Sequence, residues 1–250
     1  LDASIDLGTM PVLEAKNSAE FLRNIGIGVV GMADYMAWNK AYYDTDEGRL
    51  VGDTLMEKIA YYCYNASIDL AIEKGSYPGI KHANYDKMFG KTPEELTRIS
   101  PNGFDWVEVQ QRILKYGIRN FLILAIAPNT SSGLVQGVIA SYLPAHSKNN
   151  TQKLNGLIVP VLPKFIKERF WYYKTKFQYK TEDIIKFTKG IQRWTDTGVS
   201  MELTINPDLS PSIKSISDVI VDSMLSGELK AVYYSLTIDG TAHICTDCAN

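Results

Sequence analysis

An apolar run, Asn120–Ala127, ends at Pro128 near the middle of the chain. A run of this length without alternating polar residues is typical of a strand buried on both faces, as in parallel sheets that helices cover. Two further strand-like segments, Val199–Ile205 and Lys230–Thr237, follow it, and helical patterns separate them. Because strands that alternate with helices indicate a parallel sheet, the sequence predicts an α/β fold.

The clearest helix is predicted where apolar residues recur at three-and-four spacing, from Leu50 to Lys74, with Gly75 as a stop. Thr92-Pro93-Glu94-Glu95 supplies a cap, a proline at the first position and a Glu three residues on, which indicates a short helix. Further helices are predicted at Phe104–Tyr116, Val159–Phe177, Thr181–Trp194 and Ile216–Leu225.

The composition excludes some classes of protein. The 250 residues are 45% hydrophobic and 22% charged, and the net charge of -2 offers no basic surface for nucleic acid or an anionic membrane. Its longest apolar stretches are too short to span a membrane. Three cysteines are too few for a disulfide scaffold, which favours a reducing, cytoplasmic location. Since the chain starts at Leu1 without a methionine, we expect a fragment or the product of a split or processed gene.

Gly26-Ile27-Gly28-Val29-Val30-Gly31 fits the G-x-G-x-x-G fingerprint of dinucleotide-binding proteins. That motif requires a preceding strand, but Ala19–Asn24 is polar and looks helical. An NAD-dependent oxidoreductase that uses Gly26–Gly31 is therefore kept as an alternative. The preferred interpretation is that these glycines allow a strand to pack closely on its neighbours.

The loop Pro128-Asn129-Thr130-Ser131-Ser132 directly follows the first predicted strand. Ligands bind at the carboxyl ends of strands in parallel α/β sheets, and small hydroxyl residues with free backbone N–H groups suit a phosphate. An ordinary helix cap by Thr130 or Ser131 explains the pattern equally well.

Two redox features share the last eighteen residues: the adjacent phenols Tyr233 and Tyr234, and the pair Cys245-x-x-Cys248. Adjacent residues of a regular strand point to opposite faces, so a working tyrosine pair requires the strand to end or bend there. A C-x-x-C pair on a mobile end suits thiol redox; a zinc site that adds His243 lacks a fourth ligand. Packing is the default role for Cys63.

Taken in order, these pieces resemble the C-terminal half of the large, catalytic subunit of class I ribonucleotide reductase, over essentially the whole chain. The matching pieces are Leu1–Ala3, Ile25–Val29, Asp34–Tyr35, Phe104–Trp106, Gly117–Asn120, Pro128 with Thr130–Ser132, Val199–Ser200, Tyr233–Tyr234 and Cys245-x-x-Cys248. The resemblance implies the second half of a ten-stranded α/β barrel over residues 1–237, with a mobile tail at 238–250.

The resemblance also implies roles for the motifs. Pro128–Ser132 would bind the diphosphate of a ribonucleoside diphosphate substrate, and Tyr233 and Tyr234 would relay a radical toward a barrel cysteine. Cys245 and Cys248 would re-reduce the site and be reduced by thioredoxin or glutaredoxin. The expected partners are the N-terminal half of the large subunit and a small subunit with a dimetal, di-iron, tyrosyl-radical site. The complete large subunit would be a homodimer.

Some parts of the family pattern are missing or altered. The Asn-x-Cys-x-Glu loop with the radical cysteine is absent, as are the nucleotide effector sites, so both are expected outside this chain. The stretch Gly133–Pro144 departs from the usual segment. No cofactor or metal is expected on the chain itself. Half a barrel would expose strand edges, so the chain alone is predicted to associate and to be inactive. The remaining alternative is a non-catalytic interaction module that keeps only the fold.

Overall fold

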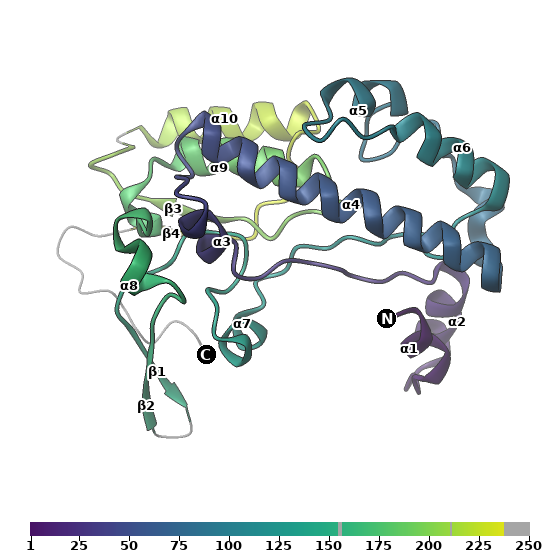
Figure 1. Cartoon of the computed structure of the whole chain (residues 1–250), viewed down its shortest axis with the longest axis horizontal. Coiled ribbons are helices and arrows are strands. Elements are labelled where there is room, and N and C mark those ends of the chain that lie inside the picture. Colours follow the sequence, from purple (N-terminus) through teal and green to yellow (C-terminus); the bar gives the residue numbers. More distant parts are fainter. Residues whose placement is uncertain (155–156, 211, 238–250) are drawn as a thin grey trace. The chain divides into compact units, whose positions relative to one another are not determined.

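Residues 1–154, 157–210 and 212–237 are described by the structure, a computed structural model (Figure 1). The chain divides into two compact units, and one boundary between them falls inside the long helix α4 (Asp46–Lys74). Unit 1 comprises Leu1–Gly28, Asp53–Ala125 and Arg193–Thr197. Unit 2 comprises Val29–Gly52, Ile126–Gln192 and Gly198–Asn250.

Unit 1 is mainly helical. Its elements are α1 (Asp2–Leu7), α2 (Leu13–Leu22), most of α4, the 3-10 helix η1 (Pro78–His82), α5 (Pro93–Ile99) and α6 (Trp106–Tyr116). The fully buried indoles of Trp106 and Trp194 stack at its centre with ring centroids 5.5 Å apart. The buried Glu57 accepts a hydrogen bond from Trp106 Nε1 at 3.0 Å, so the core carboxylate is satisfied.

Unit 2 contains the remaining elements. Its helices are α3 (Met32–Trp38), α7 (Thr130–Gln136), α8 (Ile166–Arg169), α9 (Thr181–Gln192) and α10 (Ile213–Leu225), with the 3-10 helices η2 (Phe170–Tyr172) and η3 (Lys176–Gln178). Its strands are β1 (Asn150–Leu154), β2 (Leu157–Val161), β3 (Glu202–Ile205) and β4 (Tyr234–Thr237). β1 pairs with β2 antiparallel, and β3 pairs with β4 parallel.

Parallel pairing is present in both units, as the α/β prediction requires. In unit 1, Ile27 bridges Leu124 in parallel, and the amide of Ile27 donates to the carbonyl of Ile123 at 2.8 Å. In unit 2, Glu202 of β3 lies opposite Tyr234 of β4. The three predicted strand segments therefore all take part in parallel backbone pairing. Regular strand is present at Glu202–Ile205 and Tyr234–Thr237, whereas Asn120–Ala127 contributes a bridge at Leu124.

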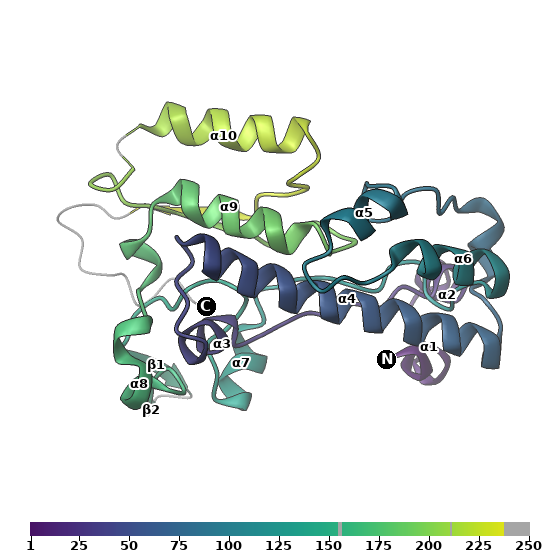
Figure 2. The ribbon, with the colours of Figure 1, turned by 45° about the horizontal axis from the view of Figure 1, so that its top comes forward.

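The core of unit 2 explains why its two long helices lie together. The buried Ile185 of α9 and Ile216 of α10 share one cluster with Met201 and Leu203 of the strand region. Helices α9 and α10 lie side by side in Figures 1 and 2. At about 25 cal/mol per Å² of buried apolar surface, such a cluster is a main stabilising contribution to the unit.

Local signals correctly predicted several helix ends. Helix α5 begins with the expected capping box, in which Thr92 and Glu95 bond reciprocally at 3.3 and 2.9 Å. Helix α4 ends before Gly75, whose φ of 84° only glycine adopts without strain. Helix α6 begins at Trp106, two residues after the predicted start at Phe104, because Asp105 accepts from the amides of Val107 and Glu108 as the N-cap.

The helix predicted at Val159–Phe177 is wrong. The segment begins in strand β2, and then contains only the four-residue α8 and two 3-10 turns. Pro160 and Pro163 lack the amide donors that a helix interior needs. The buried Tyr173 donates to the carboxylate of Asp34 at 2.7 Å, so a contact distant in sequence determines the path of this segment.

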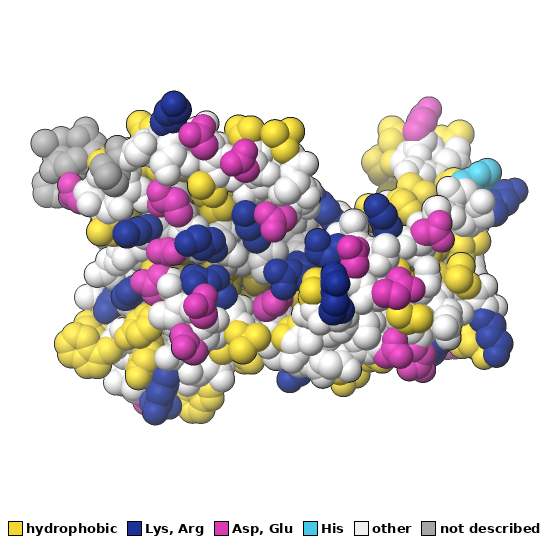
Figure 3. Space-filling model, turned by 90° about the horizontal axis from the view of Figure 1, so that it is seen from above, with side chains coloured by type: hydrophobic (Ala, Val, Ile, Leu, Met, Phe, Trp, Pro, Cys, Tyr) yellow, Lys and Arg dark blue, Asp and Glu magenta, His cyan; other side chains and the backbone are white. Residues whose placement is uncertain are grey.

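The described surface agrees with the modest net charge. On the face drawn in Figure 3, Lys and Arg side chains are interspersed with Asp and Glu side chains. None of the helices in the described residues has the length and apolar character needed to cross a bilayer.

Candidate functional site

Backbone pairing in unit 2 connects two of the predicted site segments. The amide of Ser200 donates to the carbonyl of Ile126 at 3.0 Å, and the amide of Tyr233 donates to the carbonyl of Met201 at 2.9 Å. These two hydrogen bonds link the backbone of Ile126 to that of Tyr233 through the segment Ser200–Met201. The loop after Ile126 and the tyrosine pair therefore lie in one region of unit 2.

The loop after the segment Asn120–Ala127 opens helix α7. Asn129 occupies the N-cap in the left-handed conformation (φ 51°, ψ 39°) and makes no side-chain cap hydrogen bond. Thr130, Ser131 and Ser132 form the first turn and are exposed. The first amides of a helix have no acceptor within it, so three N–H groups and three hydroxyls of this turn can bind an anion together. Neither Thr130 nor Ser131 is the N-cap, contrary to the helix-cap alternative.

Gly133 keeps this turn close to the segment that returns after α7. A Cβ at this position would lie 3.0 Å from the Cα of Ala140 and 3.2 Å from the carbonyl oxygen of Val138. The carbonyl of Gly133 accepts from the amide of Val138 at 3.0 Å. Both neighbours are backbone atoms that cannot move away easily, so the turn requires a glycine here.

Tyr233 and Tyr234 come together at the start of β4. Their ring centroids are 4.9 Å apart and their planes meet at 64°. Tyr233 precedes the first residue of the strand, so the opposite-face rule for adjacent strand residues does not separate the rings. The pair is 62% and 43% exposed, respectively. A working tyrosine pair requires the strand to end or bend at these residues, and the pair lies where β4 begins.

Sequence reasoning missed Glu202, the partner of Tyr234. The Tyr234 hydroxyl donates to Glu202 Oε2 at 2.5 Å. Burial and this neighbouring carboxylate raise the pKa of the Tyr234 phenol well above its usual value. Glu202 is buried within β3, and a Glu in the otherwise uncharged stretch Met201–Ile205 was a signal available in the sequence.

A second charge compensates Glu202. The ammonium group of Lys176, on η3, forms an ion pair with Glu202 Oε1, and both side chains are nearly buried. Nearby, burial and the positive charge of Lys176 lower the pKa of His146. Buried charges are retained in proteins when they are paired and hydrogen-bonded. Tyr234, Glu202 and Lys176 therefore form one polar cluster, here called the tyrosine–carboxylate cluster.

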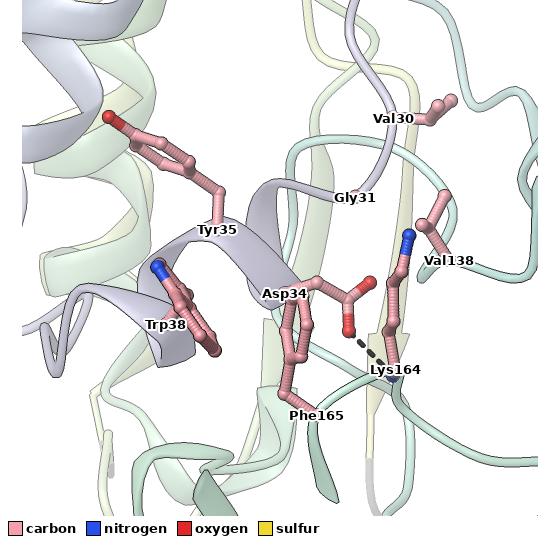
Figure 4. A pocket seen from close by; sticks show the side chains of 8 residues that line it. All are labelled: Val30, Gly31, Asp34, Tyr35, Trp38, Val138, Lys164 and Phe165. Carbon is pink, nitrogen blue, oxygen red and sulfur yellow. Dashed lines mark hydrogen bonds between the residues drawn. The ribbon is translucent and has the colours of Figure 1, made fainter. Parts of the chain in front are cut away.

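A hollow beside helix α3 contains another buried carboxylate, Asp34 (Figure 4). Asp34 accepts from the backbone amides of Ile139 and Lys164 at 2.7 and 2.9 Å, and from the Tyr173 hydroxyl. Its oxygens thus join three segments that are distant in sequence. Because these bonds use the carboxylate inside the unit, Asp34 has a structural role.

In the structure, the glycine fingerprint makes one parallel bridge, at Ile27, and its last residue, Gly31, is the N-cap of α3. Helix α2 precedes Gly26, although a dinucleotide site requires a strand there. A Cβ on Gly26 would lie 3.3 Å from the Cβ of Ala125, which fits close packing between neighbouring strands. This geometry disfavours the NAD-binding alternative.

The cysteines divide into two groups. Cys245 and Cys248 lie outside the described residues. Cys63 on α4 is partly buried, and burial raises the pKa of its thiol, as expected for a packing role. Among the described residues, no three His, Cys, Asp or Glu side chains are grouped so that they could hold a metal ion.

The chain matches the family model described as "Ribonucleotide reductase, barrel domain" over residues 1–235, so it belongs to that family. It is 36% identical over its whole length to a protein of Synechocystis named ribonucleoside-diphosphate reductase subunit alpha, of which it covers 34%. A protein of the same name from Helicobacter pylori is 29% identical over 94% of the chain, which covers 31% of that relative. The chain thus spans about a third of these relatives.

Proposed function

We propose that this chain is part of the catalytic barrel of a ribonucleoside-diphosphate reductase, which converts ribonucleotides to deoxyribonucleotides through a thiyl radical. Membership of the barrel-domain family and the name of the two relatives support this function. The radical cysteine and the effector sites would belong to the remainder of the large subunit, which we propose as the first partner. The complete large subunit would be a homodimer.

The turn Asn129–Ser132, with Pro128, would bind the diphosphate of the substrate. Its exposed hydroxyls and unpaired helix amides supply several donors with partial positive charge. Diphosphate oxygens accept such bonds without requiring a lysine or arginine in the turn. The turn follows the segment Asn120–Ala127, which pairs in parallel at Leu124, and α/β proteins bind ligands after the carboxyl ends of parallel segments.

Tyr233 and Tyr234 would relay the radical between a small subunit and the barrel cysteine. Ring contact at 4.9 Å allows an electron to pass between the two phenols. The oxidising equivalent would come from a tyrosyl radical on the small subunit, next to a dimetal site that we expect to hold two irons. The relay needs no metal ligand on this chain.

Cys245 and Cys248 would return electrons to the site after each turnover. Exchange of their two thiols with the disulfide left by the reaction transfers two electrons and two protons, and leaves a disulfide in the tail. Thioredoxin or glutaredoxin would then reduce that tail disulfide. Such a cycle requires a C-x-x-C pair that reaches both the site and a protein partner.

The observation that carries the proposal is the tyrosine pair, whose backbone is linked to the segment before the hydroxyl-rich turn through Ser200–Met201. In the complete reductase, Tyr233→Phe and Tyr234→Phe should each abolish nucleoside-diphosphate reduction, because phenylalanine cannot lose an O–H hydrogen. Binding of the substrate diphosphate should remain unchanged. Tyr62→Phe is a matched control, since Tyr62 is also 62% exposed and contacts its neighbour Tyr61 at 5.7 Å.

Two outcomes would contradict the proposal. Full turnover by either relay variant would exclude a radical path through that residue. Absence of turnover in the unmodified complete complex would favour the non-catalytic module instead. Cys245→Ser separates the tail from the relay, because it should allow about one turnover with thioredoxin and normal cycling with a small dithiol.

A further inference from the structure

The buried carboxylate of Glu202 contacts the hydroxyl oxygen of Tyr234. The Tyr234 hydroxyl donates to Glu202 Oε2 at 2.5 Å, within the range of a strong charge-assisted hydrogen bond. The Glu202 side chain belongs to a buried residue that is only 8% exposed. The register of β3 and β4 places Glu202 directly opposite Tyr234. The contact thus follows from the strand register.

The geometry points to Glu202 as the proton acceptor of Tyr234 during radical transfer. This inference rests on the proposed relay function of Tyr234. A phenol that loses one electron becomes a strong acid, so its proton must leave as the neutral radical forms. An acceptor already hydrogen-bonded to the phenol removes the need for a water molecule at that moment.

The step balances as a transfer of one electron and one proton. The relay radical derived from the small subunit takes one electron from Tyr234, the phenolic O–H bond breaks, and an O–H bond forms at Glu202 Oε2. The products are a neutral Tyr234 radical and a protonated Glu202. When the radical returns, Tyr234 regains an electron from the reduced relay partner and its proton from Glu202.

Lys176 is a positioning residue in this arrangement. Its ammonium group pairs with Glu202 Oε1, so Oε2 is left to accept from Tyr234. It also compensates the buried negative charge while Glu202 is ionised. The other titratable groups near the carboxylate are Tyr233, Tyr142 and His146. Tyr142 bonds to Thr188 at 3.1 Å instead of to Glu202.

The two relay tyrosines differ in this respect. Among the described residues, no side chain hydrogen-bonds to the hydroxyl of Tyr233, and Tyr233 is the more exposed of the pair. Glu202 thus gives Tyr234 a fixed acceptor that Tyr233 lacks within this part of the chain. The asymmetry predicts that only oxidation of Tyr234 depends on Glu202.

The test uses Glu202→Gln in the complete reductase. Glutamine keeps the size and a hydrogen-bond acceptor for Tyr234, but it is far too weak a base to take the proton. Turnover should fall about 100-fold or more, the usual contribution of a general base. The double variant Glu202→Gln/Lys176→Met removes the unpaired lysine, and it should fold normally and show the same loss. Glu228→Gln is the control, because Glu228 forms a more exposed pair with Lys189 and should leave turnover unchanged.

A second measurement distinguishes proton transfer from a structural role. Tyr234 is replaced by a polyfluorinated tyrosine, and turnover is assayed at a pH where absorbance titration of the folded subunit shows this phenol to be ionised despite burial and Glu202, so that it has no proton to transfer. In that background, Glu202→Gln should lower turnover less than about threefold, against about 100-fold with the natural tyrosine. A purely structural Glu202 would cause the same loss in both backgrounds.

The outcomes separate this inference from the proposed function. If Tyr234→Phe is inactive but Glu202→Gln retains normal turnover, Glu202 is not the acceptor and the relay still stands. An equal loss in both tyrosine backgrounds overturns the inference in the same way. If Tyr234→Phe turns over normally, the relay function itself is wrong, and the role of Glu202 fails with it.

Discussion

The pair between Lys176 and Glu202 allows a stability prediction with a defined magnitude. Their side chains are only 9% and 11% exposed, so both charges are largely removed from water. Lys176→Met leaves Glu202 buried without a compensating charge. Breaking a buried pair in this way costs about 3–5 kcal/mol of the free energy of unfolding. For a unit of this size, that loss lowers the melting temperature by about 6–20 °C.

Two further variants show whether burial causes the effect. Lys189→Met breaks the ion pair with Glu228, whose side chain is 50% exposed, and should cost less than about 1 kcal/mol. Lys176→Met/Glu202→Gln removes both buried charges and should recover most of the stability, because a neutral pair has little desolvation cost. Thermal unfolding of the complete subunit, followed by circular dichroism, measures all three. Equal losses for Lys176→Met and Lys189→Met would refute the reasoning.

Two more predictions concern the anion-binding turn and the pH dependence of stability. Gly133→Ala introduces a Cβ 3.0 Å from the Cα of Ala140, and this overpacking, at a cost of about 1–3 kcal/mol, should displace the turn and raise the KM for the substrate. Val135→Ala, at an exposed position of the same helix, should leave the KM unchanged. An unchanged KM for Gly133→Ala would contradict a binding role of the turn. Burial of Asp2 raises its pKa, but hydrogen bonds from Arg23 and Arg119 outweigh this effect, so the net pKa of Asp2 is lowered. Its contribution, about 1.5–3 kcal/mol, is therefore fully present above the unfolded pKa near 3.9 and is lost as pH falls through the lower folded value. The stability difference between the natural chain and Asp2→Asn should disappear in urea titrations at acid pH; a difference that persists there would contradict this linkage.

Local patterns were sufficient for the long helices. Leu50–Lys74 was predicted within four residues of the start of α4, because an amphipathic repeat and Gly75 are both local signals. The helix at Thr181–Trp194 was likewise confirmed as α9. The segment Val159–Phe177 failed because its structure depends on Asp34, more than a hundred residues earlier in the chain, and no local pattern contains that partner.

In the candidate site too, short local motifs could be predicted from the sequence, whereas contacts between distant segments could not. The sequence identified the hydroxyl-rich turn and the tyrosine pair, since each is a short contiguous motif. It did not identify Glu202 or Lys176, which become partners of Tyr234 only through the β3–β4 register and the position of η3. A buried glutamate in an apolar strand was a detectable signal, but its partner could not be read from it.

By itself, the sequence determined the α/β class, the long helices and the residues that could perform thiol and phenol chemistry. These features could be predicted because periodicity, helix capping and motif spacing are properties of residues close together in the chain. Only the tertiary structure decided which of these groups meet. The hydrogen bond between Glu202 and the Tyr234 hydroxyl depends on strand pairing between β3 and β4, in which these two residues lie opposite each other although 32 positions separate them. Pairing of that kind is set by the packing of the whole unit and not by local sequence.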